Sequence, residues 1–141
     1  MSSQDSESTP QEVFLRGAWK CVPSEDDLSW VQHVSRQPLS EEPLGDYGAL
    51  VARMLECGVT EYDIARFAKI VGYETACGIA YHLEDPNASY EDFPDDRNEQ
   101  LAWQLYLVDD ETNQPLEPLT GLHESLLSLD PSGREMRPKS D

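Results

Sequence analysis

The chain has 141 residues, a length that suits one domain. It carries 28 Asp and Glu against 10 Lys and Arg, a formal net charge of −18. Such a field disfavours approach to nucleic acid or to an anionic membrane surface, and it favours basic partners. Apolar residues are clustered in the middle of the chain, so we expect a folded domain over residues 12–130 between two solvated ends.

Both ends of the chain are polar. Residues 1–11 have neither an apolar run nor a basic start, which predicts a disordered tail and no signal peptide. Residues 131–141 are predicted to be a second polar tail. The odd number and wide spacing of Cys21, Cys57 and Cys77 predict buried thiols in a reducing compartment rather than a disulfide framework. Because every apolar stretch is too short to cross a bilayer, we predict a cytoplasmic protein that does not bind membranes.

The first helical signals follow a short apolar stretch. Residues 13–22 hold two apolar clusters, which predict an extended segment packed on the body of the domain. Ser24 and Asp27 then have the spacing of an N-cap and an acid at the third helical position. The helix that they begin is predicted to end near Arg36, because Pro38 disfavours helical geometry at the residue before it.

The middle of the chain predicts three helices joined by short turns. Asp46 is the expected cap of the first, and Gly58 its C-terminal stop. Thr60 is the expected cap of the second helix, which is predicted to end at Gly72, and residues 74–83 form the third. Such short turns predict antiparallel or steeply crossed neighbours.

The C-terminal third predicts a hairpin and a last helix. Residues 101–108 alternate in the manner of a strand, and their nearly uniform apolar character favours a strand covered on both faces. A helix is the alternative there, because three of these residues also share a helical face. The turn-rich residues 109–115 favour a hairpin that returns through residues 116–119, and residues 121–129 form a short amphipathic helix.

These elements together predict a mainly α fold of about five helices with a small C-terminal β-hairpin, and an α+β arrangement is the alternative. No motif in the sequence identifies a family.

One alternative function is a DNA-binding regulator that uses residues 60–83. This segment has the cap, the turn glycine and the second helix of a helix-turn-helix. Its second half contains no Lys or Arg, whereas DNA binding depends on cations that neutralise phosphates. We therefore expect a packed helical hairpin here and no nucleic acid partner.

A second alternative is a small metal-binding or hydrolytic protein around His82 and Asp85. One imidazole and one carboxylate fall short of the three or four protein ligands of a zinc site. A calcium loop that starts at Asp85 also departs from the required pattern, because Tyr90 occupies the position that needs glycine. We expect no cofactor, no metal and no enzymatic activity.

The leading hypothesis is a non-enzymatic interaction protein, inhibitor-, immunity- or chaperone-like, that binds a basic protein. Seven of the sixteen residues from Glu84 to Glu99 are acidic, and Tyr90 and Phe93 lie among them. Acidic side chains steer a basic partner and aromatic side chains supply contact area. Alternatively, the two aromatic residues pin this segment to the core. The predicted partner-binding residues are Glu84, Asp85, Tyr90, Glu91, Asp92, Phe93, Asp95, Asp96, Asp109, Asp110 and Glu111.

Overall fold

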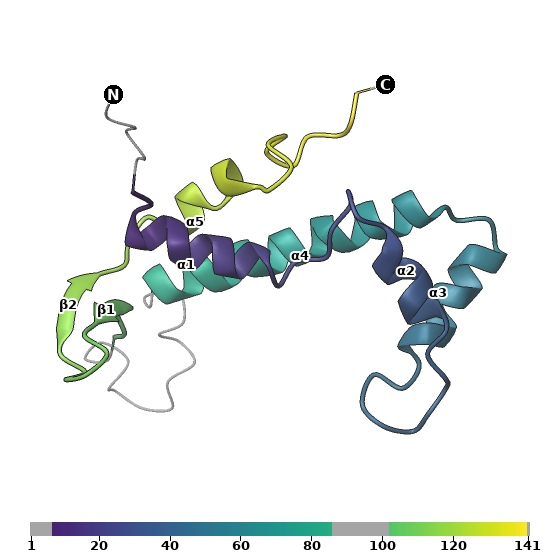
Figure 1. The fold of residues 1–141 in the computed structure, drawn as a ribbon, viewed down its shortest axis with the longest axis horizontal. Coiled ribbons are helices and arrows are strands. Elements are labelled where there is room, and N and C mark those ends of the chain that lie inside the picture. The colour runs from purple at the N-terminus through teal and green to yellow at the C-terminus, as the bar shows by residue number, and fades with distance from the viewer. Residues whose placement is uncertain (1–6, 86–101, 141) are drawn as a thin grey trace. The chain divides into compact units, whose positions relative to one another are not determined.

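The computed structural model describes residues 7–85 and 102–140 (Figure 1). Among these residues, five α-helices and one small antiparallel hairpin confirm the predicted fold class, mainly α with a C-terminal hairpin. The elements are α1 (Pro10–Trp19), α2 (Ser29–Ser35), α3 (Tyr47–Glu56), α4 (Glu61–Glu84), β1 (Tyr106–Val108), β2 (Pro115–Pro118), α5 (Leu122–Ser125) and a 3-10 turn, η3 (Leu127–Leu129).

The chain divides into two compact units. The helical unit is Cys21–Tyr73, and the hairpin unit consists of Met1–Lys20 and Glu74–Asp141. Helix α4 contributes residues to both. The single domain expected over residues 12–130 stays a prediction.

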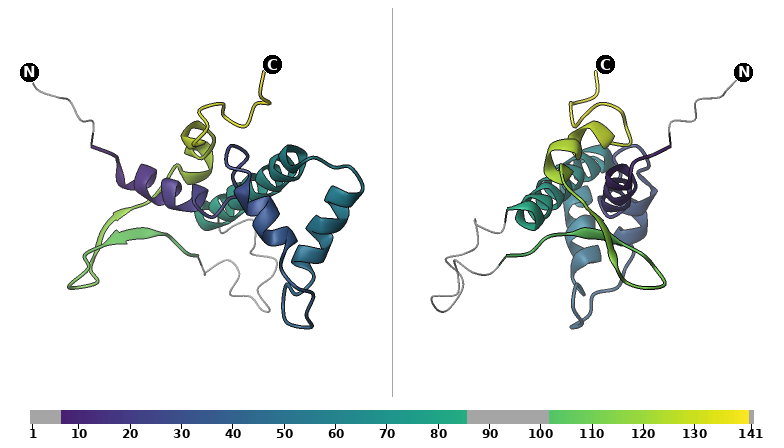
Figure 2. Two further views of the ribbon diagram at one scale, coloured as in Figure 1. Left: turned by 45° about the vertical axis from the view of Figure 1, so that its right-hand side comes forward. Right: turned by 90° about the vertical axis from the view of Figure 1, so that its left-hand side faces the viewer.

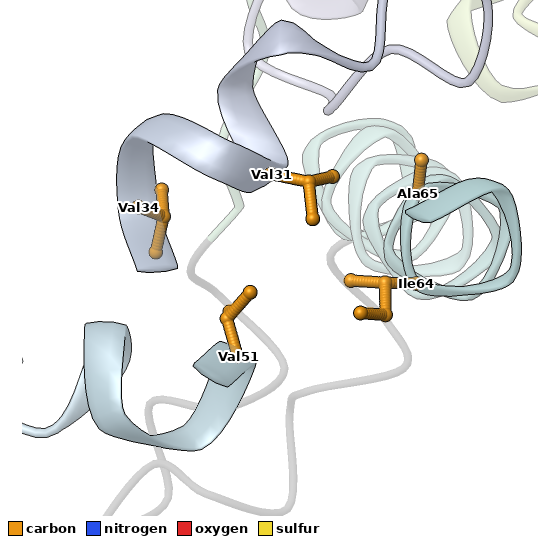
Figure 3. Close-up of a cluster of buried hydrophobic side chains, with 5 residues drawn as sticks. All are labelled: Val31, Val34, Val51, Ile64 and Ala65. Carbon is orange, nitrogen blue, oxygen red and sulfur yellow. The ribbon is translucent and has the colours of Figure 1, made fainter. Parts of the chain in front are cut away.

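The core of the helical unit is a cluster of buried aliphatic side chains from three helices. Val31 and Val34 of α2, Val51 of α3, and Ile64 and Ala65 of α4 form one buried cluster, with Val31, Val51 and Ile64 at its centre (Figure 3). Burying a Val or Ile side chain stabilises a fold by about 1.5–3 kcal/mol. This cluster therefore holds α2, α3 and the start of α4 together.

The turn between α3 and α4 follows the sequence signals. Gly58 adopts a left-handed conformation, with φ of 92°, and α3 ends two residues before it at Glu56. The Thr60 hydroxyl accepts a hydrogen bond from the Asp63 N–H at 3.1 Å, as expected for a helix cap. Asp46 occupies the predicted N-cap position of α3, but its side chain makes no capping hydrogen bond.

The prediction that Gly72 ends a helix is wrong, because α4 continues through it to Glu84. A Cβ atom at Gly72 would lie 3.0 Å from Val22 Cγ1 and 3.2 Å from Pro23 Cδ. An added Cβ would require these two side chains to move by a few tenths of an ångström, so glycine here accommodates close packing and not a turn.

The prediction that Ser24 begins a helix is also wrong, although its expected hydrogen bond forms. The Ser24 hydroxyl accepts from the Asp27 N–H at 3.0 Å, yet α2 begins five residues later, at Ser29. Asp27 in turn accepts hydrogen bonds from the Ser29 hydroxyl and N–H, which hold the pKa of its carboxyl below the usual value. These side chains satisfy backbone N–H groups within consecutive turns, and no helix forms before Ser29.

The extended segment predicted for residues 13–22 is wrong over most of its length, since helix α1 spans Pro10–Trp19. The Thr9 hydroxyl caps this helix by accepting a hydrogen bond from the Glu12 N–H at 3.2 Å. Pro10 occupies the first turn, where its fixed φ suits a helix and its missing N–H costs nothing. Residues 10–11 therefore belong to α1 and not to a disordered tail.

The core of the hairpin unit joins α1 to α5. Leu15 and Trp19 lie one turn apart on α1, and both are buried, as are Leu122 and Leu126. The indole N–H of Trp19 donates a 2.8 Å hydrogen bond to the Leu126 carbonyl. This bond satisfies the polar atom of a buried aromatic side chain at the C-terminal end of α5.

The hairpin confirms a strand over Tyr106–Val108 only; residues 102–105 of the predicted strand have no regular structure, and the predicted burial is also corrected. Tyr106 pairs with Pro118 and Leu107 with Glu117, and the strands run side by side in both views of Figure 2. Leu107 is half-buried, whereas Tyr106 and Val108 are 45% and 46% exposed. The strand is thus covered on one face only, because alternation sends successive side chains to opposite faces.

Two further sequence expectations concern membranes and thiols. Within residues 7–85 and 102–140, no helix combines the length and the apolar character needed to cross a membrane. The prediction of buried thiols is wrong for Cys21 and Cys57, which are exposed, and Cys77 is half-buried.

Candidate protein-interaction site

The turn of the hairpin carries three of the predicted partner-binding carboxylates. Asp109 accepts hydrogen bonds from the N–H groups of Glu111 (2.9 Å) and Thr112 (3.0 Å). These bonds, the one from Thr112 first, hold the pKa of the Asp109 carboxyl below the usual value. Asp109 therefore shapes the turn, and Asp110 and Glu111 are exposed on it.

Exposed apolar side chains accompany these acids on the same hairpin. Tyr106, Val108 and Leu116 are 45%, 46% and 61% exposed, and Glu117 is exposed on β2. The pairing shifts between Leu107 and Val108, which leaves Leu116 as the extra residue of a bulge. The hairpin thus presents acidic and apolar groups within a few residues of each other.

Glu84 belongs to an acidic run in the sequence, but its carboxylate makes contacts within the protein. Its carboxylate accepts hydrogen bonds from the N–H groups of Leu122 and His123, at the start of α5. It also pairs with His123 Nδ1 at 2.8 Å, and its side chain is only 14% exposed. The carboxylate is an internal cap for α5, and its predicted part in partner binding stays a prediction.

Asp85 also has an internal contact. The Tyr81 hydroxyl donates a hydrogen bond to Asp85 Oδ2 at 2.9 Å. This bond and the negative charge of Asp85 raise the pKa of Tyr81, because ionised Tyr81 would lose the bond and face a carboxylate.

The remaining predicted partner-binding residues lie outside the described part of the chain. They are Tyr90, Glu91, Asp92, Phe93, Asp95 and Asp96.

The His82 and Asp85 pair proposed for metal or hydrolytic chemistry has other contacts. The His82 ring packs against the Trp103 ring, with centroids 4.9 Å apart, and the His82 carbonyl accepts the Trp103 indole N–H. Asp85 contacts Tyr81 instead. Among residues 7–85 and 102–140, no group of three or more His, Cys, Asp or Glu side chains lies close enough to hold a metal ion.

The packed helical hairpin predicted for residues 60–83 is wrong, and so is the turn that the helix-turn-helix alternative needs. Residues Glu61–Glu84 form one continuous helix, so this segment has no turn that could place a second helix in a DNA groove.

The helical unit contains an apolar groove that the sequence analysis missed. Its volume is about 480 Å³. One wall is α3, with Tyr47, Val51 and Met54, and the other is the first half of α4, with Asp63 and Phe67. Phe67 lies one turn after the buried Ile64 on α4, yet it is 69% exposed. Periodicity identifies an apolar face but not whether another element covers it.

A buried ion cluster lies in the same unit. The Glu25 side chain is 1% exposed and pairs with Arg66 Nη1 at 3.0 Å and Lys69 Nζ at 3.6 Å. Glu25 lies in the turns before α2 and is one of the few buried charged residues among those that the structure describes. Two cations around one carboxylate, almost closed to solvent, form a structural cluster and not a docking surface.

Comparison with family models, with curated proteins and with solved structures finds no match to this chain. Function is therefore inferred from its own side chains.

Proposed function

We propose that this protein is a small, non-enzymatic, cytoplasmic interaction protein that binds a basic protein partner through an acidic surface. Inhibitors, immunity proteins and secretion chaperones share this combination of size and charge, which is an analogy and not a family assignment.

The first support is the distribution of charge along the chain. Residues 70–133 contain 14 Asp and Glu, and Arg97 is their only Lys or Arg. A long segment of one sign attracts a cationic protein and accelerates its encounter. The same charge repels the phosphates of nucleic acid, so we propose no nucleic acid partner.

The observation that carries the proposal is the surface of the hairpin. Asp110 and Glu111 are exposed on its turn, and Glu117, Tyr106 and Leu116 are exposed on its strands. Acids that steer a partner, next to apolar groups that exclude water, are the parts of a protein-binding surface. Residues Asp109 to Asn113 fold into a tight turn, with Asn113 N–H bonded to the Asp109 carbonyl at 2.8 Å, so this surface is held in place before binding.

Affinity capture from the native cell tests the proposal. The tagged protein is used as bait at about 50 mM and about 500 mM salt, which spans the range where exposed charges become screened. The expected result is a basic protein that is retained at low salt and released at high salt. Bait that retains only neutral or acidic proteins, or a partner insensitive to salt, contradicts the proposal.

A pair of charge variants tests the location of the surface. The hairpin variant carries Asp110→Asn, Glu111→Gln and Glu117→Gln. The control variant carries Glu7→Gln, Glu41→Gln and Glu42→Gln, which removes the same charge from exposed positions elsewhere. We expect the hairpin variant to weaken capture about tenfold more than the control. Equal weakening would show that total charge, and not this surface, determines binding.

A further inference from the structure

We propose that the groove between α3 and α4 binds a basic amphipathic helix of the partner protein. This inference rests on the proposed function, because it assigns the groove to the same basic partner.

The walls of the groove match the side chains of a helix. Tyr47, Val51 and Met54 are spaced at i, i+4 and i+7 on α3, so they extend about 10 Å along that helix. Phe67 faces them from α4. A groove between two helices, about two turns long, suits the apolar stripe of a third helix.

The exposure of these side chains shows that the groove is a surface and not a closed core. Phe67 is 69% exposed, and Tyr47 and Met54 are each 38% exposed. Large apolar side chains that are exposed together mark an interaction site, because a partner that covers them removes their apolar surface from water. The helical unit itself does not depend on them, since its core is formed by the buried cluster around Val31 and Val51.

The charge of the groove lining and of the whole chain indicates which kind of helix binds in the groove. Asp63 is the one charged residue in the groove lining and is exposed there, one turn before Phe67 on α4. An apolar helix with a Lys or Arg beside its apolar stripe covers the groove and pairs with this carboxylate. A second copy of this chain is disfavoured, because each copy carries a charge of −18.

A synthetic helix of defined charge tests the assignment directly. The probe is a fluorescein-labelled peptide of about 16 residues, long enough for helix formation, with Leu at i, i+3, i+4 and i+7 and Lys elsewhere. A peptide with Glu in place of Lys keeps the apolar stripe and reverses the charge. Fluorescence anisotropy with the full chain should show binding of the Lys peptide and at least tenfold weaker binding of the Glu peptide.

Variants locate the binding. Phe67→Ser should weaken binding of the Lys peptide at least tenfold. Asp63→Asn should weaken it about threefold and reduce its dependence on salt. The matched control is Ile79→Ser, which removes an exposed apolar side chain (57% exposed) from α4 outside the groove, and it should bind like the wild type. Met54→Gln is a second groove variant, which repeats the test from α3.

Several results would overturn the inference. They are equal binding of the Lys and Glu peptides, equal binding by the Phe67→Ser and Ile79→Ser chains, or a wild-type dimer in sedimentation that Phe67→Ser dissociates.

Failure of the groove assignment is distinguishable from failure of the proposed function. If the hairpin variant loses the captured partner and Phe67→Ser retains it, the groove assignment fails and the acidic surface stands. If no basic partner is captured while Lys-peptide binding depends on Phe67, the proposed function fails and the groove stands.

Discussion

Glu25 and Arg66 lie 41 positions apart in the chain and form a 3.0 Å ion pair in the interior of the helical unit. Lys69 completes the cluster from the next turn of α4. These ion pairs hold the segment before α2 against α4. This segment has no helix or strand of its own. A buried carboxylate between two cations is costly to disturb, because removing it leaves charges without compensation.

Glu25→Gln should therefore lower the free energy of unfolding by about 3 kcal/mol. The variant keeps the shape of the side chain but removes the negative charge that pairs with Arg66 and Lys69. Urea unfolding monitored by circular dichroism measures the change. Glu41→Gln, at an exposed position, is the control and should change the free energy by less than about 0.5 kcal/mol. Similar values for the two variants would show that the cluster does not stabilise the fold.

Glu84→Ala should destabilise α5 by about 2 kcal/mol, because two N–H groups at its start lose their acceptor. Glu84→Gln should have a smaller effect, since an amide oxygen still accepts a hydrogen bond. Amide hydrogen exchange at Leu122 and His123 reports the loss. Glu124→Ala, at a side chain that is 77% exposed, provides the comparison. Unchanged exchange in Glu84→Ala would refute the capping role.

The Asp109 carboxyl should titrate below the usual range of an aspartate, because two backbone N–H groups stabilise its charged form. The stabilisation that it gives to the turn is fully present above the pKa of the unfolded chain. It is lost as the pH falls through the lower pKa of the folded chain. Carbon-13 NMR titration of the side-chain carboxyl measures this pKa. A value at or above that of an aspartate in an unfolded peptide would contradict the hydrogen bonds of the turn.

Tyr81 should ionise at a higher pH than a free tyrosine, because its hydroxyl donates to Asp85. The contribution of this bond to stability is present below the pKa of the unfolded chain and lost as the pH rises through the raised pKa. Asp85→Asn should lower the pKa of Tyr81 toward the usual value. NMR titration of tyrosine labelled at Cζ separates Tyr81 from the other tyrosines. An equal pKa in wild type and variant would show that Asp85 is not its partner.

The elements that the sequence predicts well are those whose signals are local. Gly58 and Thr60 end one helix and begin the next, and each acts within a few residues of its own position. The alternation in residues 101–108 predicts the strand for the same reason. Helix α1 could also have been predicted, because Thr9, Pro10 and Glu12 form a cap, a first-turn proline and a capping acid.

Features that depend on residues distant in sequence could not be predicted. Gly72 has the local sequence signature of a helix end. Its role in close packing is visible only from the position of Val22, which is distant in sequence. Glu84 belongs to an acidic run, and only the position of α5 shows that it is a cap. Phe67 has helical spacing with the core, and only the tertiary structure shows that it lines an exposed groove. Of the residues predicted to bind a partner, Asp110 and Glu111 are exposed, and their role in binding stays a prediction.

The rate of association with the captured basic partner, measured across salt concentrations by stopped-flow fluorescence, tests the central claim most directly. An acidic surface that steers its partner predicts a rate constant that falls at least tenfold between about 50 and about 500 mM salt. It also predicts a shallower fall in the Asp110→Asn, Glu111→Gln, Glu117→Gln variant. A rate constant that is independent of salt, in both chains, would contradict the account.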